Sequence, residues 1–174
     1  MGTVLMLASE SYFLQAEASL ATVNILPALA GSGSTLFENG ITASFTYLYK
    51  NAANTYFNTT AAATLKDNYK TANPTSALVN WTLATTDAAK LEAIITQKYI
   101  AVNMITSEEG FNEYKRTGYP TISAGATAAT ATFASLKSGA PAVDKLPTRI
   151  LYPAVEFQVN SENVPKGVSP YTTK

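Results

Sequence analysis

The sequence predicts an all-α protein built from helix pairs, with little β-strand. Three long segments repeat apolar residues at the three- and four-residue spacing of an amphipathic helix. Two of the predicted helix starts also carry the Thr-x-x-Glu spacing of a capping box. At 174 residues, the chain is long enough for one domain with a sizeable core.

The first predicted helix spans residues 4–20, where polar side chains separate the apolar ones. A Gly-Ser-Gly-Ser run at 31–34 predicts a turn after it. Thr35 and Glu38 form a capping box, so a second helix should start near Thr35 and fade around 49–54. The first part of the chain therefore predicts two helices joined by a loop.

The middle of the chain, 51–86, is rich in Asn, Thr, Ala and aromatic residues. It predicts an irregular segment with one short helix around 61–69. Helical periodicity returns over 87–104. Thr106 and Glu109 then repeat the capping-box spacing before a short helix, which predicts an antiparallel helix pair.

The last part of the chain holds a loop and a short helix. Gly118 and Pro120 should end the preceding helix. From 122 to 142 the sequence is a low-complexity tract of Ala, Gly, Ser and Thr, which predicts a mobile loop. The run 147–153 looks extended and leads into a short helix with Pro153 near its first position.

Charge and composition exclude several classes of function. Twelve basic residues balance twelve acidic ones without any Lys/Arg-rich run, so no nucleic-acid partner is expected. The chain has neither His nor Cys, which rules out the usual zinc and redox-metal ligand sets and a Ser-His-Asp triad. Only carboxylate and carbonyl oxygens remain as ligands for a hard cation, and we predict no metal site and no cofactor.

Catalysis is not expected either. None of the acidic residues forms a recognisable acid–base pair by spacing, and Glu10 and Glu17, which share a helix face, are better explained as a solvated or ion-paired stripe. The only two arginines, Arg116 and Arg149, each begin an Arg-x-x-Tyr-Pro motif. We interpret both as structural residues that pair with acids such as Glu113.

Four stretches of the sequence carry a resemblance when they are taken together. They are residues 6–18, 37–45, 95–101 running on to 111–120, and 147–156, of which the last has the pattern Arg-x-x-Tyr-Pro-x-x-Glu. In this order they resemble the carboxy-terminal portion of SusD/RagB-like outer-membrane nutrient-binding lipoproteins. The resemblance covers nearly the whole chain.

The resemblance implies an all-α fold of tetratricopeptide-like helix pairs with long irregular loops. It also implies a lipoprotein on the surface of the outer membrane of Bacteroidetes, which captures glycans or peptides for a SusC-like TonB-dependent transporter. Because members of that family are longer, we expect residues 1–174 to be a carboxy-terminal portion. The export signal and lipid anchor would then lie on an amino-terminal portion, which would cover an apolar face of this chain.

The aromatic and Asn-rich segment supplies candidate ligand-binding residues, namely Tyr56, Tyr69, Trp81, Asn54 and Asn80. An aromatic face can stack on the apolar face of a pyranose, while Asn amides offer donors and acceptors to sugar hydroxyls. The structural alternative, which such residues more often represent, is that they close helix ends and loops.

Two classes of function therefore remain. The leading hypothesis is a non-catalytic protein that binds an oligosaccharide or peptide. The alternative is a helical interaction scaffold that docks on the transporter without binding ligand itself. A glycosidase is a distant third, and hydrolysis of a glycan panel would reveal it.

The loop at 122–142 can be tested by limited proteolysis. We expect trypsin to cut first at Lys137, because this tract has almost no apolar area to offset the entropy of ordering it. Mass spectrometry of the early fragments would locate the cut. A Lys137 that resists cleavage while other sites are cut would contradict the prediction.

Overall fold

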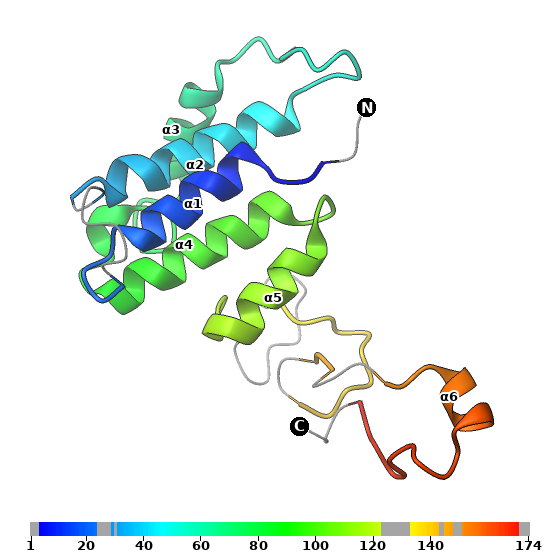
Figure 1. Cartoon of the computed structure of the whole chain (residues 1–174). Helices are drawn as coiled ribbons and strands as arrows, with labels where there is room; N and C mark the ends of the chain where they lie inside the picture. The colour runs from blue at the N-terminus through cyan, green and yellow to red at the C-terminus, as the bar shows by residue number, and fades with distance from the viewer. Residues whose placement is uncertain are drawn as a thin grey trace. The chain divides into compact units, whose positions relative to one another are not determined.

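A computed structural model of the chain describes residues 4–23, 29, 31–122, 133–142, 145–147 and 151–170 (Figure 1). It confirms the all-α prediction, since the described part contains no strand beyond a single bridge between Lys50 and Tyr56. The chain divides into two compact units, residues 1–120 and 121–174. Its helices are α1 (Ala8–Ala18), α2 (Gly33–Leu48), α3 (Ala62–Ala72), the 3-10 helix η2 (Trp81–Leu83), α4 (Asp87–Val102), α5 (Ser107–Thr117) and α6 (Ala154–Val159).

Most of the predicted helices are present, but two of their starts differ from the prediction. The first helix begins at Ala8 rather than at residue 4. The second begins at Gly33, close to the predicted start near Thr35, but Thr35 is not its capping residue. Ser32 takes the capping position there, and its hydroxyl donates to the Leu29 carbonyl instead of accepting from the helix. The second helix therefore forms without the predicted capping box.

The contrast between two threonines shows why one cap forms and another does not. Thr86, before α4, has an extended backbone, and its hydroxyl accepts from the Ala89 N–H at 3.1 Å. Thr106, before α5, starts the helix as predicted, but its ψ of 62° is not extended and it makes no side-chain cap. The Ser107 hydroxyl instead accepts from the Met104 N–H. At the other end, Gly118 closes α5 in the left-handed conformation, as predicted.

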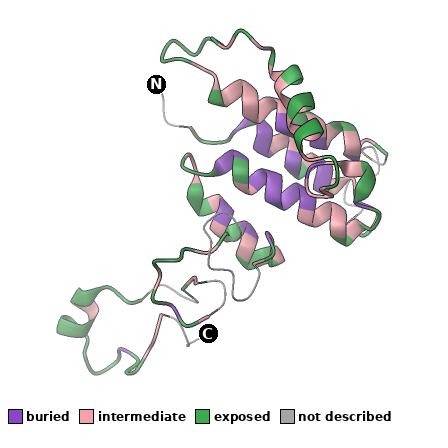
Figure 2. Ribbon diagram, turned by 180° about the vertical axis from the view of Figure 1, so that it is seen from behind, coloured by how far each residue is buried: buried purple, intermediate pink, exposed green. Residues whose placement is uncertain are grey.

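The core of the first unit is centred on α4. This helix packs against α1, α2 and α5, while α2 also packs against α1 and α3. Figure 2 shows the buried residues gathered on α1, α2 and α4. The rings of Phe13 and Phe37 meet edge to face at 6.1 Å between centroids, and Trp81 lies 5.4 Å from Phe37. The remaining buried members of the core are Ala16, Leu20, Ile41, Ala93, Ile94, Ile95 and Ala101.

A network of ion pairs, buried except at Arg116, joins α1, α4 and α5. The Nζ of Lys98 in α4 lies 2.7 Å from a carboxylate oxygen of Glu113 in α5 and 3.4 Å from one of Glu10 in α1. Arg116 of α5 binds both carboxylate oxygens of Glu17 on α1, at 2.6 and 2.7 Å, and also pairs with Glu113. This confirms that Glu10 and Glu17 form an ion-paired stripe and that Arg116 is structural. Arg149 lies outside the described residues.

The network also sets the charge of its members. Burial would raise the pKa of the Glu113 carboxyl, but hydrogen bonds from Lys98 and Arg116 outweigh it and hold that pKa below its ordinary value. The pKa of Arg116 is raised, chiefly by its hydrogen bonds to Glu17. Both groups therefore stay charged across the neutral pH range.

Residues 121–174 form a separate unit with little helix. Pro153 directly precedes α6 and Glu156 lies in its first turn, as predicted. Of the predicted mobile loop, residues 123–132 lie outside the described part, and 133–142 contain neither helix nor strand. Lys137 is exposed there, so the proteolysis prediction stands untested. No helix in the described part of the chain is both long and apolar enough to cross a membrane.

The glycine in the middle of α2 can be tested by substitution. A methyl group at Gly40 would lie 2.5 Å from Cε1 of Phe13, whose ring is buried between the helices. We expect Gly40→Ala to lower the free energy of unfolding by about 1–3 kcal/mol through overpacking, although Ala is the better helix former. Urea unfolding measures this, with Gly139→Ala as the control because that position faces open space. Equal stability of the two variants would contradict close packing at Gly40.

The ion network can be tested at its centre. Lys98 is buried, and its removal leaves the carboxylates of Glu10 and Glu113 short of a partner. We expect Lys98→Ala to cost about 3–5 kcal/mol of unfolding free energy. The exposed Lys115 of α5 is the matched control, and its replacement by Ala should leave stability nearly unchanged. If both variants unfold at the same urea concentration, the network does not stabilise the fold.

Candidate functional site

An open polar groove runs between α1 and α2. Its volume is 310 Å³, near the lower limit of the range of about 300–1,000 Å³ that is typical of small-molecule sites. A groove of this size suits a short end of a ligand rather than a long stretch of it. It is lined by Ala8, Tyr12, Asn39, Thr42, Ala43, Thr46, Tyr47 and Lys50.

The helix period explains how α2 presents its part of the groove. Asn39, Ala43 and Tyr47 follow one another at four-residue spacing, and Thr42, Thr46 and Lys50 do the same one position round the helix. Two neighbouring rows of side chains, polar except at Ala43, therefore lie on one face of α2, and Lys50 extends one of them just past the helix end. The apolar residues of α2, such as Phe37 and Ile41, point into the core instead.

Four polar side chains of the groove make no hydrogen bond or ion pair with another described residue. They are those of Tyr12, Asn39, Tyr47 and Lys50. The Thr42 and Thr46 hydroxyls donate to carbonyls of their own helix at 2.9 Å, so toward the groove they offer acceptor lone pairs. The groove thus combines aromatic rings with unsatisfied donors and acceptors. This is the chemistry that binds a polyhydroxylated molecule with an apolar face.

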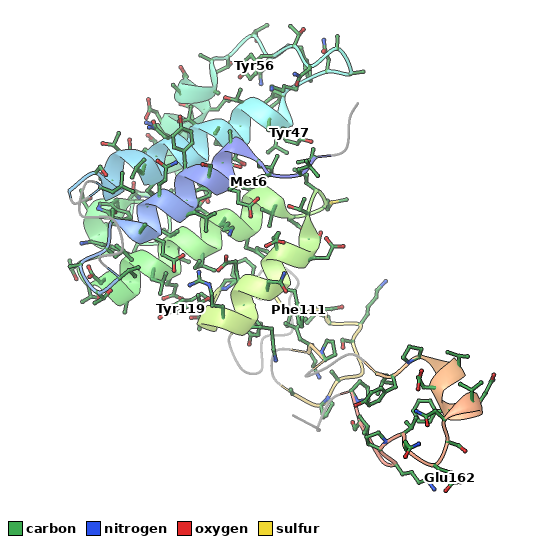
Figure 3. All side chains as sticks on the ribbon, in the orientation of Figure 1. Met6, Tyr47, Tyr56, Phe111, Tyr119 and Glu162 are labelled. Atoms are coloured by element: carbon green, nitrogen blue, oxygen red, sulfur yellow. The ribbon has the colours of Figure 1, made fainter. Side chains whose placement is uncertain are left out.

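A loop continues from the Lys50 end of the groove. The side-chain oxygen of Asn51 accepts from the N–H groups of Ala53 and Thr55, which shapes the turn, and Asn54 has a positive φ of 62° and is exposed. The chain then returns so that Tyr56 pairs with Lys50. Figure 3 labels Tyr47 near the carboxyl end of α2 and Tyr56 on this loop.

The structure separates the five predicted ligand-binding residues into two groups. Tyr56 and Asn54 lie on the loop beside the groove, where the Tyr56 hydroxyl donates to the Thr60 carbonyl and its ring meets that of Tyr49. Tyr69, Trp81 and Asn80 lie elsewhere, at the border of the core, where their polar ends or rings meet other residues.

Each of these three residues has a packing partner. The Tyr69 hydroxyl accepts from Gln97 at 3.1 Å, Trp81 packs on Phe37, and the Asn80 amide donates to the Asn73 carbonyl at 2.7 Å. Their rings and amides are therefore occupied by the fold. The structure does not bring all five residues to one site.

Sequence reasoning missed most of the groove. It pointed to the segment after α2 because aromatic and Asn residues are dense there, whereas Tyr12, Asn39, Thr42 and Thr46 are spread along two predicted helices. The four-residue spacing of polar side chains on α2 was the available signal. The contribution of Tyr12 needs the packing of α1 on α2 and has no local signal.

A second cavity of 240 Å³ lies among α1, α2, α3 and α4, and its walls are mostly apolar. It is lined by Phe13, Ile41, Ser44, Phe45, Leu48, Tyr69, Gln97 and Ile100. Leu48 and Ile100 are exposed at its edge. Its apolar walls suit an apolar side chain better than a sugar.

No metal centre is formed in the described part of the chain, where no group of three or more acidic side chains could hold an ion. The acidic residues of α1 and α2 are instead engaged in ion pairs. Glu38 lies against Lys66 and Lys70 of α3, and the hydrogen bond from Lys70 lowers its pKa.

A helical core with an open groove of polar and aromatic side chains is the architecture of a helical binding protein. The sequence matches the SusD-like family, described as Susd and RagB outer membrane lipoprotein, over residues 1–172. The chain therefore belongs to this family, whose members are non-catalytic nutrient-binding lipoproteins of the outer membrane. Comparison with curated proteins and with solved structures gave no match.

Proposed function

We propose that this chain captures an oligosaccharide at the cell surface and passes it to a SusC-like TonB-dependent transporter. Membership of the SusD-like family supports the nutrient-binding role. The observation that carries the choice of a sugar is the groove between α1 and α2. Its two tyrosine rings are flanked by an amide, two threonine hydroxyls and a lysine.

The ligand contacts follow from the geometry of the groove. Tyr12 and Tyr47 would stack on sugar rings, while Asn39 would exchange hydrogen bonds with ring hydroxyls. Asn54 and Tyr56, on the adjoining loop, would contact the next part of the ligand. Tyr69, Trp81 and Asn80 would act indirectly, by holding the helices in place.

A scaffold role is the second candidate, and the apolar cavity favours it. Leu48 is 58% exposed and Ile100 is 44% exposed at the edge of that cavity. Exposed apolar side chains around a hollow are typical of a surface that receives another protein. In this role the chain would dock on the transporter without binding the sugar itself.

Direct binding measurements separate these two functions. We expect the chain to bind members of an oligosaccharide panel in calorimetric titrations. Tyr47→Ala should weaken that binding by about tenfold, which corresponds to about 1.4 kcal/mol for one lost stacking contact. Tyr47→Phe is the matched variant, because it keeps the ring and should retain most of the affinity.

Unfolding curves for both Tyr47 variants would show that the fold is intact. Absence of binding to any oligosaccharide, together with binding to the purified transporter, would favour the scaffold role. Binding of peptides but of no sugar would overturn the choice of ligand.

A further inference from the structure

The groove between α1 and α2 contains one cation and no carboxylate. Lys50 lines it at the carboxyl end of α2, half-buried and without an ion-pair partner among the described residues. The other ligand-facing groups are neutral amides, hydroxyls and rings. A groove with this lining carries a local positive charge, although the whole chain has a net charge of zero.

The acidic residues of the two helices that form the groove are neutralised away from it. Helix α1 carries Glu10 and Glu17, which bind Lys98 and Arg116 inside the first unit. Helix α2 carries only Glu38, which binds Lys66 and Lys70 of α3. None of these carboxylates is therefore left to pair with Lys50 or to repel an anion in the groove.

The carboxyl end of a helix disfavours anions, because its last carbonyls point outward. At the end of α2 two of those carbonyls, and that of Tyr49 just beyond the helix, accept hydrogen bonds. Phe45 accepts from the Tyr49 N–H at 3.2 Å, Tyr47 from the Lys50 N–H at 3.1 Å, and Tyr49 from the Phe57 N–H at 3.0 Å. The full positive charge of the Lys50 ammonium also exceeds the partial negative charge of a helix end, which is about half an elementary charge.

We infer that the groove selects an acidic saccharide, whose carboxylate or sulfate pairs with Lys50 while its ring rests against Tyr47. This inference rests on the proposed function and narrows it to a charged class of sugar. The anion is recognised by a charge-assisted hydrogen bond, and the ring by the aromatic face. Carboxylate and sulfate offer the same acceptor chemistry, so both sugar types enter the test.

The test uses the full 174-residue chain and pairs of sugars that differ only in charge. The first pair is an oligogalacturonate and its methyl ester. The second is a sulfated oligosaccharide and its desulfated form. At low salt we expect at least one acidic member to bind about tenfold more tightly than its neutral partner, since a hydrogen bond to a charged group contributes about 1.5–3 kcal/mol.

The variants assign that preference to one side chain. Lys50→Gln should remove the difference between acidic and neutral members, while Lys50→Arg should keep it. Lys115→Gln, which removes an exposed lysine from α5, should also keep it. Added salt should weaken binding of the acidic ligand and leave binding of its neutral partner unchanged, because salt screens a charge pair in an open groove.

Several outcomes would overturn the inference. One is equal binding of the acidic and neutral members while Tyr47→Ala still weakens sugar binding. That result would leave the proposed function standing. Another is an acidic preference that survives in Lys50→Gln. A third is equally tight, Lys50-dependent binding of an acidic peptide without sugar. If no saccharide binds at all, the proposed function and this inference fail together.

Discussion

The fold of the first unit depends on how three buried carboxylates are paired at the junction of α1, α4 and α5 with two cations, the buried Lys98 and the half-exposed Arg116. Lys98 is buried in α4, where its side chain is paired with Glu10 and Glu113, because a charged group out of water is costly unless it is paired. Such a network is weak evidence for net stability, because desolvation offsets much of the attraction. The network does fix the position of α1 along its axis relative to α4 and α5. Sliding α1 by one turn would separate Glu17 from Arg116 and leave the buried carboxylate of Glu17 without its partner, while Arg116 would keep only Glu113.

The fixed orientation of α1 explains where the groove lies. One side of α1 carries Phe13 and the two paired glutamates, so Tyr12 is left to face the neighbouring surface of α2. Helix α2 is divided in the same way: Phe37 enters the core, Glu38 meets the lysines of α3, and Asn39 opens onto the groove. Three successive residues of one helix thus meet three different environments. The polar groove is what remains after the core and the ion pairs have been formed.

The periodicity of the sequence was sufficient for the helices but not for the site. Helix α4 was predicted within two residues, because its apolar repeat and the turn before it agree with its tertiary position. The start at Ala8 and the capping residue of α2 were missed, since a helix end depends on backbone geometry that side-chain patterns do not determine. The candidate site was harder still. Aromatic density pointed to Trp81 and Tyr69, yet in the structure both serve packing, while the groove combines residues from two helices whose contact no local pattern reveals.

The close approach of α1 and α2 has an evolutionary consequence. Because Gly40 leaves room for the ring of Phe13, these two positions share one volume. Cores tolerate exchanges that conserve total volume much better than single enlargements. Among relatives of this chain, a larger residue at the position of Gly40 should therefore occur together with a smaller one at that of Phe13. The two positions would then change together, and their covariation among relatives would mark the contact between α1 and α2.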